Sequence, residues 1–177
     1  VGLSELYGIG ATAIREALSR LVTEGLVDSE DQRGFCVAPV SRAELLDLTQ
    51  TRIEVESLAL RHAIERGDVE WESALLGIFH RLSKAPLPTS PELQDNWRGL
   101  HRQFHESLVA GCGSRWTMRL CRLLYDKSER YRNLSERHTS PQKRDTIAEH
   151  RNLMDAAMAR DAAAATQLLS AHFWETT

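Results

Sequence analysis

The stretch LHRQFHESL, from Leu100 to Leu108, sets two histidines four residues apart in an otherwise amphipathic segment. Side chains four residues apart on an α-helix project from one face, so His101 and His105 are expected to point to the same side. Neutral imidazole is the commonest protein ligand for zinc and similar divalent metals. The pair is therefore half of a candidate metal site, although two hydrogen-bonded histidines on a helix edge would give the same pattern.

The other half of this site is expected near the end of the chain. The sequence ARDA at 159–162 predicts a helix end followed by Asp161 as an N-cap, and hence two antiparallel helices. His150 lies about eleven residues before this turn and His172 about eleven after it, so both reach the same height at about 1.5 Å rise per residue. We therefore expect His101, His105, His150 and His172 to bind one divalent metal, Zn²⁺ or Ni²⁺. The HExxH pattern of zinc proteases is absent.

Composition limits the class of protein. The 177 residues are 42% hydrophobic and 27% charged, as in a soluble protein with one large domain or a small module joined to a larger one. No apolar run has the length of a membrane span and no signal peptide is visible, so we expect no membrane partner. Three cysteines without a CxxC pair favour the reducing cytoplasm. The net charge of −3 does not exclude nucleic acid, because only one face needs to be basic.

The first forty residues have the element order of a winged helix-turn-helix. Residues 3–7 predict a short helix, 11–24 a second helix ended by Gly25, and 26–30 with 34–40 a β-hairpin. Helix, turn, helix and hairpin follow one another in this order in winged DNA-binding modules. The numbering begins without Met and inside a predicted helix, so we expect the module's first helix to precede it.

From Ser41 onward the pattern changes to long helices. Proline-rich and glycine-rich loops separate them. The predicted helices span 41–66, 70–83, 93–111, 114–135, 142–159 and 162–175. The fold class is therefore mainly α, with an incomplete winged module at 1–40 and an all-helical domain at 41–177.

Several stretches together carry a family resemblance over nearly the whole chain. GATAIREALSRLVTEGLV at 10–27 and RGFCVAPVS at 33–41 resemble the DNA-binding module of the GntR family of bacterial transcriptional regulators. The FH pair at 104–105, followed by later EH and AH pairs, resembles the metal-binding FCD effector domain of its FadR-type branch. The chain departs from the family where Ala11 and Ala13 replace a frequent Arg and Pro. It also has His101 where the first metal ligand is commonly Asp.

The resemblance implies a cytoplasmic, homodimeric regulator, and we expect a repressor. It would bind operator DNA and sense a small carboxylic acid through its metal-containing domain. The implied DNA contacts are Thr12 and Arg15 in the first turns of the recognition helix, and Arg33 and Gly34 at the hairpin tip. Helical periodicity alone would assign Thr12 and Arg15 to an ordinary polar face.

Arg52 is the unusual residue of the helix predicted at 41–66, because it falls in the middle of an apolar stripe. A buried guanidinium needs an anion, since an unpaired charge away from water is costly. One interpretation pairs it with Glu56 or Asp126. The other makes it a bidentate clamp on a ligand carboxylate, which the resemblance favours. Arg130 is a second candidate for the same contact.

Two other functions compete with regulation. A four-histidine site would also suit a metalloenzyme, but no motif supplies the general base that such catalysis needs, so we expect no enzyme. Alternatively, the metal would only hold together a helical interaction module. The four tryptophans are interpreted as core and interface anchors rather than as a platform for bases. They are Trp71, Trp97, Trp116 and Trp174.

Overall fold

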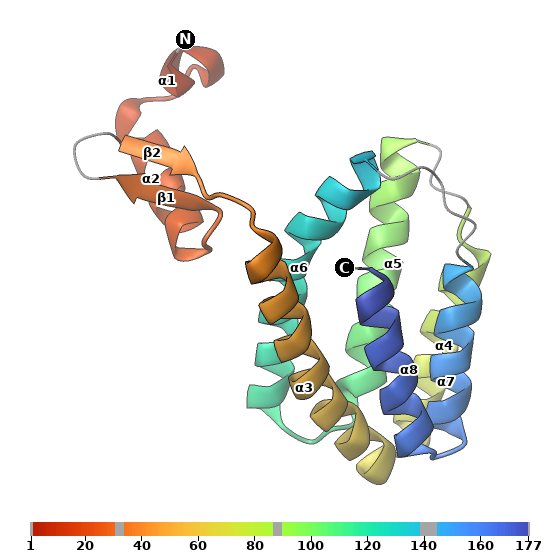
Figure 1. Ribbon diagram of the computed structural model, residues 1–177. Coiled ribbons are helices and arrows are strands. Elements are labelled where there is room, and N and C mark those ends of the chain that lie inside the picture. Colours follow the sequence, from red (N-terminus) through yellow and green to blue (C-terminus); the bar gives the residue numbers. More distant parts are fainter. Residues whose placement is uncertain (1, 31–33, 87–89, 139–144, 177) are drawn as a thin grey trace. The chain divides into compact units, whose positions relative to one another are not determined.

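The computed structural model describes residues 2–30, 34–86, 90–138 and 145–176. It is mainly helical, as the sequence predicts, and its chain forms two compact units, Val1–Ser41 and Arg42–Thr177 (Figure 1). The first unit contains α1 (Leu3–Tyr7), α2 (Ala11–Thr23), β1 (Val27–Glu30) and β2 (Gly34–Val37). The second contains α3 (Arg42–Arg66), α4 (Val69–Lys84), α5 (Pro91–Ala110), α6 (Arg115–His138), α7 (Thr146–Met158) and α8 (Ala162–Glu175).

The N-terminal unit has the predicted helix, helix and hairpin. Gly25 follows α2 with a φ of 67°, the left-handed conformation that glycine adopts without strain and that ends a helix. The two strands are antiparallel, with Val27 opposite Val37 and Glu30 opposite Gly34. Residues 31–33 between the strands lie outside the described residues.

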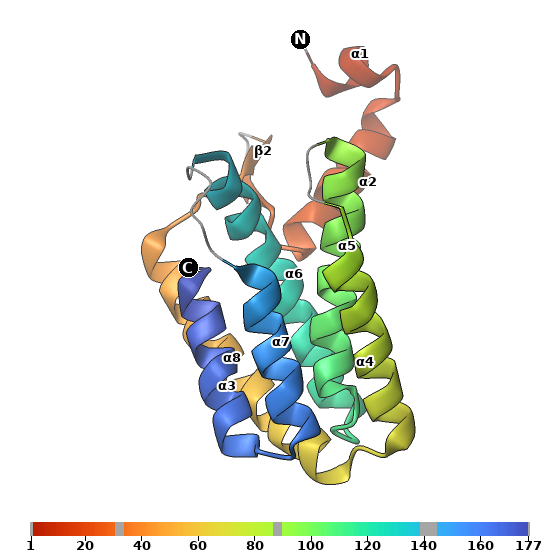
Figure 2. The ribbon, with the colours of Figure 1, turned by 90° about the vertical axis from the view of Figure 1, so that its right-hand side faces the viewer.

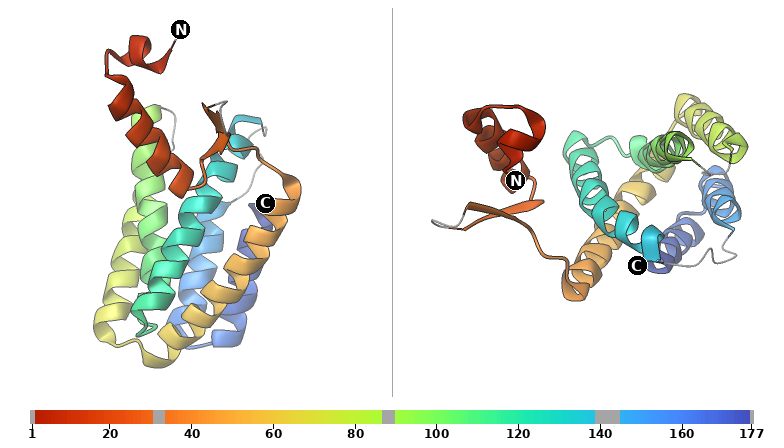
Figure 3. Two further views of the ribbon diagram at one scale, coloured as in Figure 1. Left: turned by 90° about the vertical axis from the view of Figure 1, so that its left-hand side faces the viewer. Right: turned by 90° about the horizontal axis from the view of Figure 1, so that it is seen from above.

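The helices of the second unit form a closed ring, best seen from above (Figure 3). Around this ring α3 contacts α6, α6 contacts α5, α5 contacts α4, α4 contacts α7, α7 contacts α8, and α8 returns to α3. The apolar faces meet inside the ring, where burial of side chains such as Leu60, Leu75, Phe104, Leu108 and Leu153 drives folding. The ring therefore holds its interior side chains away from water.

Local signals fix where these helices begin and end. Asp161 caps α8, because its side chain accepts a hydrogen bond from the backbone N–H of Ala164 at 2.9 Å. Asp145 caps α7 in the same way, so this helix starts at Thr146. The start predicted at residue 142 falls outside the described residues. The antiparallel α7–α8 pair predicted from the Asp161 cap is confirmed.

In the parts of the chain that the structure describes, no helix combines the length and apolar character needed to cross a membrane.

Candidate metal centre

Four histidines from three helices meet inside the ring. α5 supplies His101 and His105, α7 supplies His150 and α8 supplies His172. All are buried, with exposed fractions of at most 4%. One ring nitrogen from each lies within 4.8 Å of the others. The ring centroids of His150 and His172 are 4.6 Å apart, so the matched height predicted for these two residues is confirmed. We call these four residues the histidine cluster.

The spacing of the histidine cluster fits a metal ion. A metal about 2.1 Å from each nitrogen sets opposite nitrogens about 4.2 Å apart and adjacent ones about 3 Å apart. The observed spread exceeds this by only about half an ångström, which small ring rotations remove. Nε2 of His150 lies 3.3 Å from Nε2 of His105, and the buried Nδ1 of His105 has no hydrogen-bond partner among the described residues. A cation between the Nε2 atoms would use lone pairs that otherwise face one another.

Oxygen acceptors orient two of these rings. Nδ1 of His150 lies 2.5 Å from the carbonyl oxygen of Thr146, and Nδ1 of His172 lies 2.8 Å from Oε2 of Glu149. A neutral ring that donates its Nδ1 proton to such an acceptor presents the lone pair of Nε2 on its other side. The outer contacts therefore prepare both rings as metal ligands.

Burial sets the protonation state of the two histidines on α5. It lowers the pKa of His101 and His105 well below the ordinary value of 6.5. Positive charge on the neighbouring histidines and on Arg52 lowers the pKa of both further. Both rings are therefore neutral at pH 7, which is the form that binds a metal.

Two side chains of α6 reach the histidine cluster from the side. The hydroxyl of Tyr125 is 3.1 Å and Nη1 of Arg132 is 3.2 Å from Nδ1 of His101. The Arg132 guanidinium also lies over the Tyr125 ring, 4.4 Å from its centroid, and pairs with Glu129 at 2.6 Å. Its Nε is buried and has no hydrogen-bond partner in the described parts of the chain. Trp97 stacks on His101 with ring centroids 4.8 Å apart.

Arg52 is buried at 4% exposure, as its apolar stripe predicts. Its Nε donates to Oε1 of Glu56 at 2.9 Å, and its Nη1 donates to the hydroxyl of Ser128 at 2.8 Å. Burial raises the pKa of Glu56, and the charge of Arg52 opposes that rise. The guanidinium lies 4.0 Å from the ring centroid of Phe173, the residue after His172. Of the two partners weighed from the sequence, Glu56 is therefore the one present.

The remaining predicted site residues lie at the following places. Arg130 is partly buried on α6, two residues before the Arg132 that contacts His101. Thr12 and Arg15 are exposed on α2, and Gly34 begins β2 with a φ of 93°. Arg33 lies outside the described residues.

The tryptophans expected as anchors divide into two pairs. Trp71 is buried and Trp97 packs partly buried against the core. Trp116 and Trp174 are 72% and 43% exposed.

Sequence reasoning missed Arg132 and Tyr125 as neighbours of the histidine cluster. They stand seven residues apart, which places them on one face of a helix. That spacing was a signal, but tyrosine and arginine are equally common on faces exposed to solvent.

Two family models together match most of the chain. The model of bacterial regulatory proteins of the gntR family matches residues 2–37, and the FCD domain model matches residues 47–174. The HTH-type transcriptional regulator BphR of Paraburkholderia xenovorans is 42% identical over 96% of this chain and 70% of its own length. The HTH-type transcriptional repressor GlaR of Escherichia coli is 38% identical over 96% of this chain and 79% of its own.

A solved structure has the same fold. E. coli McbR/YncC superposes with a TM-score of 0.76 at 21% identity, over 98% of this chain and 81% of that one. The matched domains and the relatives are those of transcriptional regulators rather than enzymes. The chain therefore belongs to the GntR family of bacterial regulatory proteins, in which it is a transcriptional regulator with an FCD domain.

Proposed function

We propose that this regulator is a repressor that senses a small carboxylate through a divalent metal held by the histidine cluster. The observation that carries this proposal is the partly buried Arg132, whose Nη1 borders the cluster and whose buried Nε has no hydrogen-bond partner among the described residues. The metal would supply a Lewis-acidic centre with open coordination positions. Four imidazoles leave an octahedral metal two such positions, and nitrogen ligands suit zinc and nickel.

The charges around the cluster favour an anion. Arg52 pairs with Glu56, Arg132 pairs with Glu129, and Glu149 hydrogen-bonds His172. With the imidazoles in the neutral form that binds a metal, these groups together carry one net negative charge. A divalent metal would turn this into one net positive charge, which a single carboxylate neutralises. Away from water an uncompensated charge is costly, so a neutral sugar or base would leave the site less stable than an acid would.

We assign effector contacts to Arg132 and Arg52, and we retain Arg130 as the candidate from sequence. Nε of Arg132 has no acceptor in the part of the chain that the structure describes, while Arg52 already donates to Glu56 and Ser128. A carboxylate that reached Arg52 would therefore have to compete with Glu56 for it. Short dicarboxylates and hydroxy acids, which carry a second oxygen group for the metal, fit this arrangement best.

The DNA-binding proposal rests on the N-terminal unit. We assign base and phosphate contacts to Thr12 and Arg15 on α2, and backbone contacts to Arg33 and Gly34 of the hairpin. GntR regulators act on DNA, and the bacterial chromosome lies in the cytoplasm, so the cytoplasm is the proposed location. Because α3 follows this unit directly in the chain and carries Arg52, a ligand that shifts α3 would change DNA affinity.

We further propose that the protein is a homodimer, which matches the two half-sites of a two-fold operator. α6 carries an exposed apolar stripe at helical spacing, with Trp116, Leu120 and Leu123 exposed by 72%, 47% and 51%. A contiguous apolar face of this kind marks an interaction surface. A second copy of the chain, with the same stripe, is the occupant that a two-fold interface requires.

The test is calorimetric titration of short mono- and dicarboxylates and hydroxy acids into the full natural protein loaded with nickel. We expect at least one acid to bind, with Arg132→Gln weakening its binding about tenfold or more, since hydrogen bonds to charged groups contribute about 1.5–3 kcal/mol. Arg122→Gln, on the same helix, is the matched control, because Arg122 pairs with Glu106 and not with the histidine cluster. Operator DNA is obtained by letting the protein select its binding sequences from a random pool. The best-binding acid is then added to the protein–DNA complex, and release of the DNA is measured.

The outcomes separate a sensor from a structural metal. Binding of an acid that weakens in Arg132→Gln and releases DNA supports the proposal. If the metal raises thermal stability but no acid binds, the metal has only a structural role, which is to hold α5, α7 and α8 together. If no metal is retained, the sensing proposal is abandoned.

A further inference from the structure

A cleft separate from the histidine cluster lies between α4 and α7, which run side by side (Figure 2). It is open to solvent and has a volume of about 500 Å³. Both helices contribute to its lining, and none of the lining side chains is a carboxylate. The lining residues are Leu76, Phe79, His80, Ser83, Lys84, Arg151 and Met154.

The floor of the cleft is apolar. Phe79 and Met154 are 5% and 6% exposed, so they belong to the core and present one surface to the cleft. Leu76 is 46% exposed beside them, although a large apolar side chain gains by leaving water. The floor therefore offers apolar contact to a ligand body.

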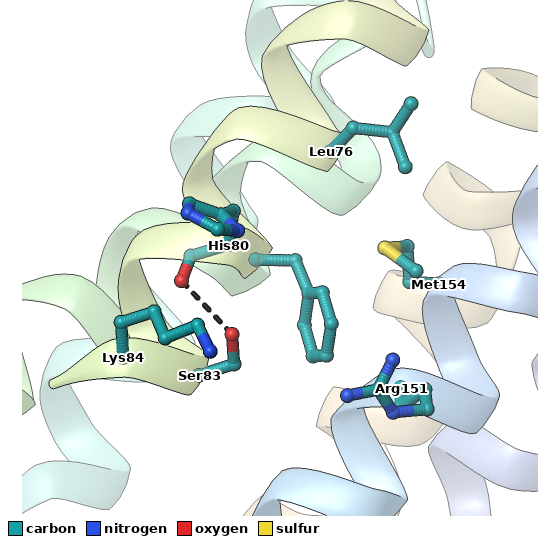
Figure 4. A pocket seen from close by; sticks show the side chains of 7 residues that line it. Leu76, His80, Ser83, Lys84, Arg151 and Met154 are labelled. Atoms are coloured by element: carbon teal, nitrogen blue, oxygen red, sulfur yellow. Dashed lines mark hydrogen bonds between the residues drawn. The ribbon is translucent and has the colours of Figure 1, made fainter.

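The rim of the cleft is cationic. Figure 4 shows Lys84 and Ser83 on one side of the opening and Arg151 on the other. The Arg151 guanidinium lies 5.1 Å from the ring centroid of Phe79. Within the described parts of the chain neither Lys84 nor Arg151 forms an ion pair. By contrast, Arg160 close to the same helices pairs with Glu72.

We propose that this cleft is a second binding site, which takes a small organic anion with an apolar body, such as an aromatic or branched carboxylate. Two unpaired cations on opposite sides complement an acid group, and the apolar floor complements its body. The volume lies within the roughly 300–1,000 Å³ typical of small-molecule sites. The site goes beyond the proposed sensing function, since it uses neither the metal nor the effector arginines.

The test uses 2-naphthoate as the probe, titrated into the full-length protein with and without added metal and followed by calorimetry. Its neutral analogue 2-naphthamide lacks the charge, and acetate lacks the apolar body. Lys84→Gln and Arg151→Gln each remove one cation from the rim, and both side chains are at the surface, so the fold is retained. Arg81→Gln removes one cation from the same helix but outside the cleft, where Arg81 donates to Gln103.

We expect saturable binding of 2-naphthoate, weakened roughly three- to tenfold by either rim substitution and unchanged by Arg81→Gln. We expect 2-naphthamide and acetate to bind much more weakly. Equal affinity in Arg151→Gln, equal affinity for the amide, or absence of saturable binding would each overturn the proposal. Loss of binding in Arg52→Ala would also overturn it, because the probe would then occupy the interior. Failure of metal binding leaves this test intact, so the two proposals fail separately.

Discussion

Glu149→Gln isolates the contribution of one outer contact to metal binding. Oε2 of Glu149 accepts from Nδ1 of His172 at 2.8 Å, so a carboxylate touches the histidine cluster directly. Glutamine keeps the size and an oxygen acceptor but removes the charge. The ring of His172 therefore stays in place while its Nε2 becomes a weaker donor to the metal.

The size of the effect follows from metal linkage. Loss of such an outer partner lowers metal affinity about 10- to 100-fold. With free metal well above the dissociation constant of both proteins, this removes about 1.4–2.7 kcal/mol of stabilisation. For a chain of this length each kcal/mol corresponds to roughly 2–4 °C, so the melting temperature of the metal-loaded protein should fall by about 3–11 °C.

The assay is thermal unfolding by calorimetry, with nickel and with a chelator. The wild type and Glu149→Gln should differ with metal and nearly coincide without it. Glu106→Gln is the matched control, because Glu106 pairs with Arg102 and Arg122 and not with the cluster. An equal difference between wild type and Glu149→Gln in chelator would refute the reasoning, because the carboxylate would then stabilise the fold and not the metal.

Other predictions follow from burial, protonation and exposure. Because the pKa values of His101 and His105 lie below 6.5 in the folded protein, the stability that they contribute to the metal-free protein is complete above pH 6.5. This free energy of unfolding is lost as pH falls from 6.5 towards the folded pKa values of the two histidines. The loss is up to about 1.4 kcal/mol per pH unit for each histidine, and urea unfolding between pH 5 and 8 measures it. Phe104→Ala should cost about 3–5 kcal/mol in the same unfolding assay, since Phe104 is fully buried against His150; a cost below 1 kcal/mol contradicts its core role. Leu123→Glu should shift the protein from dimer to monomer by light scattering, while Leu58→Glu on α3 should not; an unchanged dimer excludes the α6 stripe as the interface.

Hydrophobic periodicity predicted the helices, and capping residues predicted several ends, because both depend on contacts within a few residues. The meeting of His150 and His172 was predictable for the same reason, since a tight turn at Asp161 fixes the relative height of two adjacent helices. The Arg52–Glu56 pair, four residues apart, was also within reach as one of two alternatives.

Contacts between helices distant in sequence were beyond local rules. Arg132 contacts His101 across 31 positions, and the rotation of α6 that brings them together is set by packing of the whole ring. The cleft between α4 and α7 depends on the same packing, because neither helix alone brings Lys84 near Arg151. Arg130 and Arg132 looked alike in sequence, and only the orientation of α6 distinguishes them.

The measurement that tests the central claim most directly is X-ray absorption at the nickel edge, on the nickel-loaded protein with and without the best-binding carboxylate. The account predicts four imidazole nitrogens at about 2.1 Å in both samples, with oxygen ligands that change when the acid is added. The His105→Ala protein should lose one imidazole from this shell. A spectrum without imidazole scattering, or one that His105→Ala and the acid both leave unchanged, would contradict a metal-based sensor in the histidine cluster.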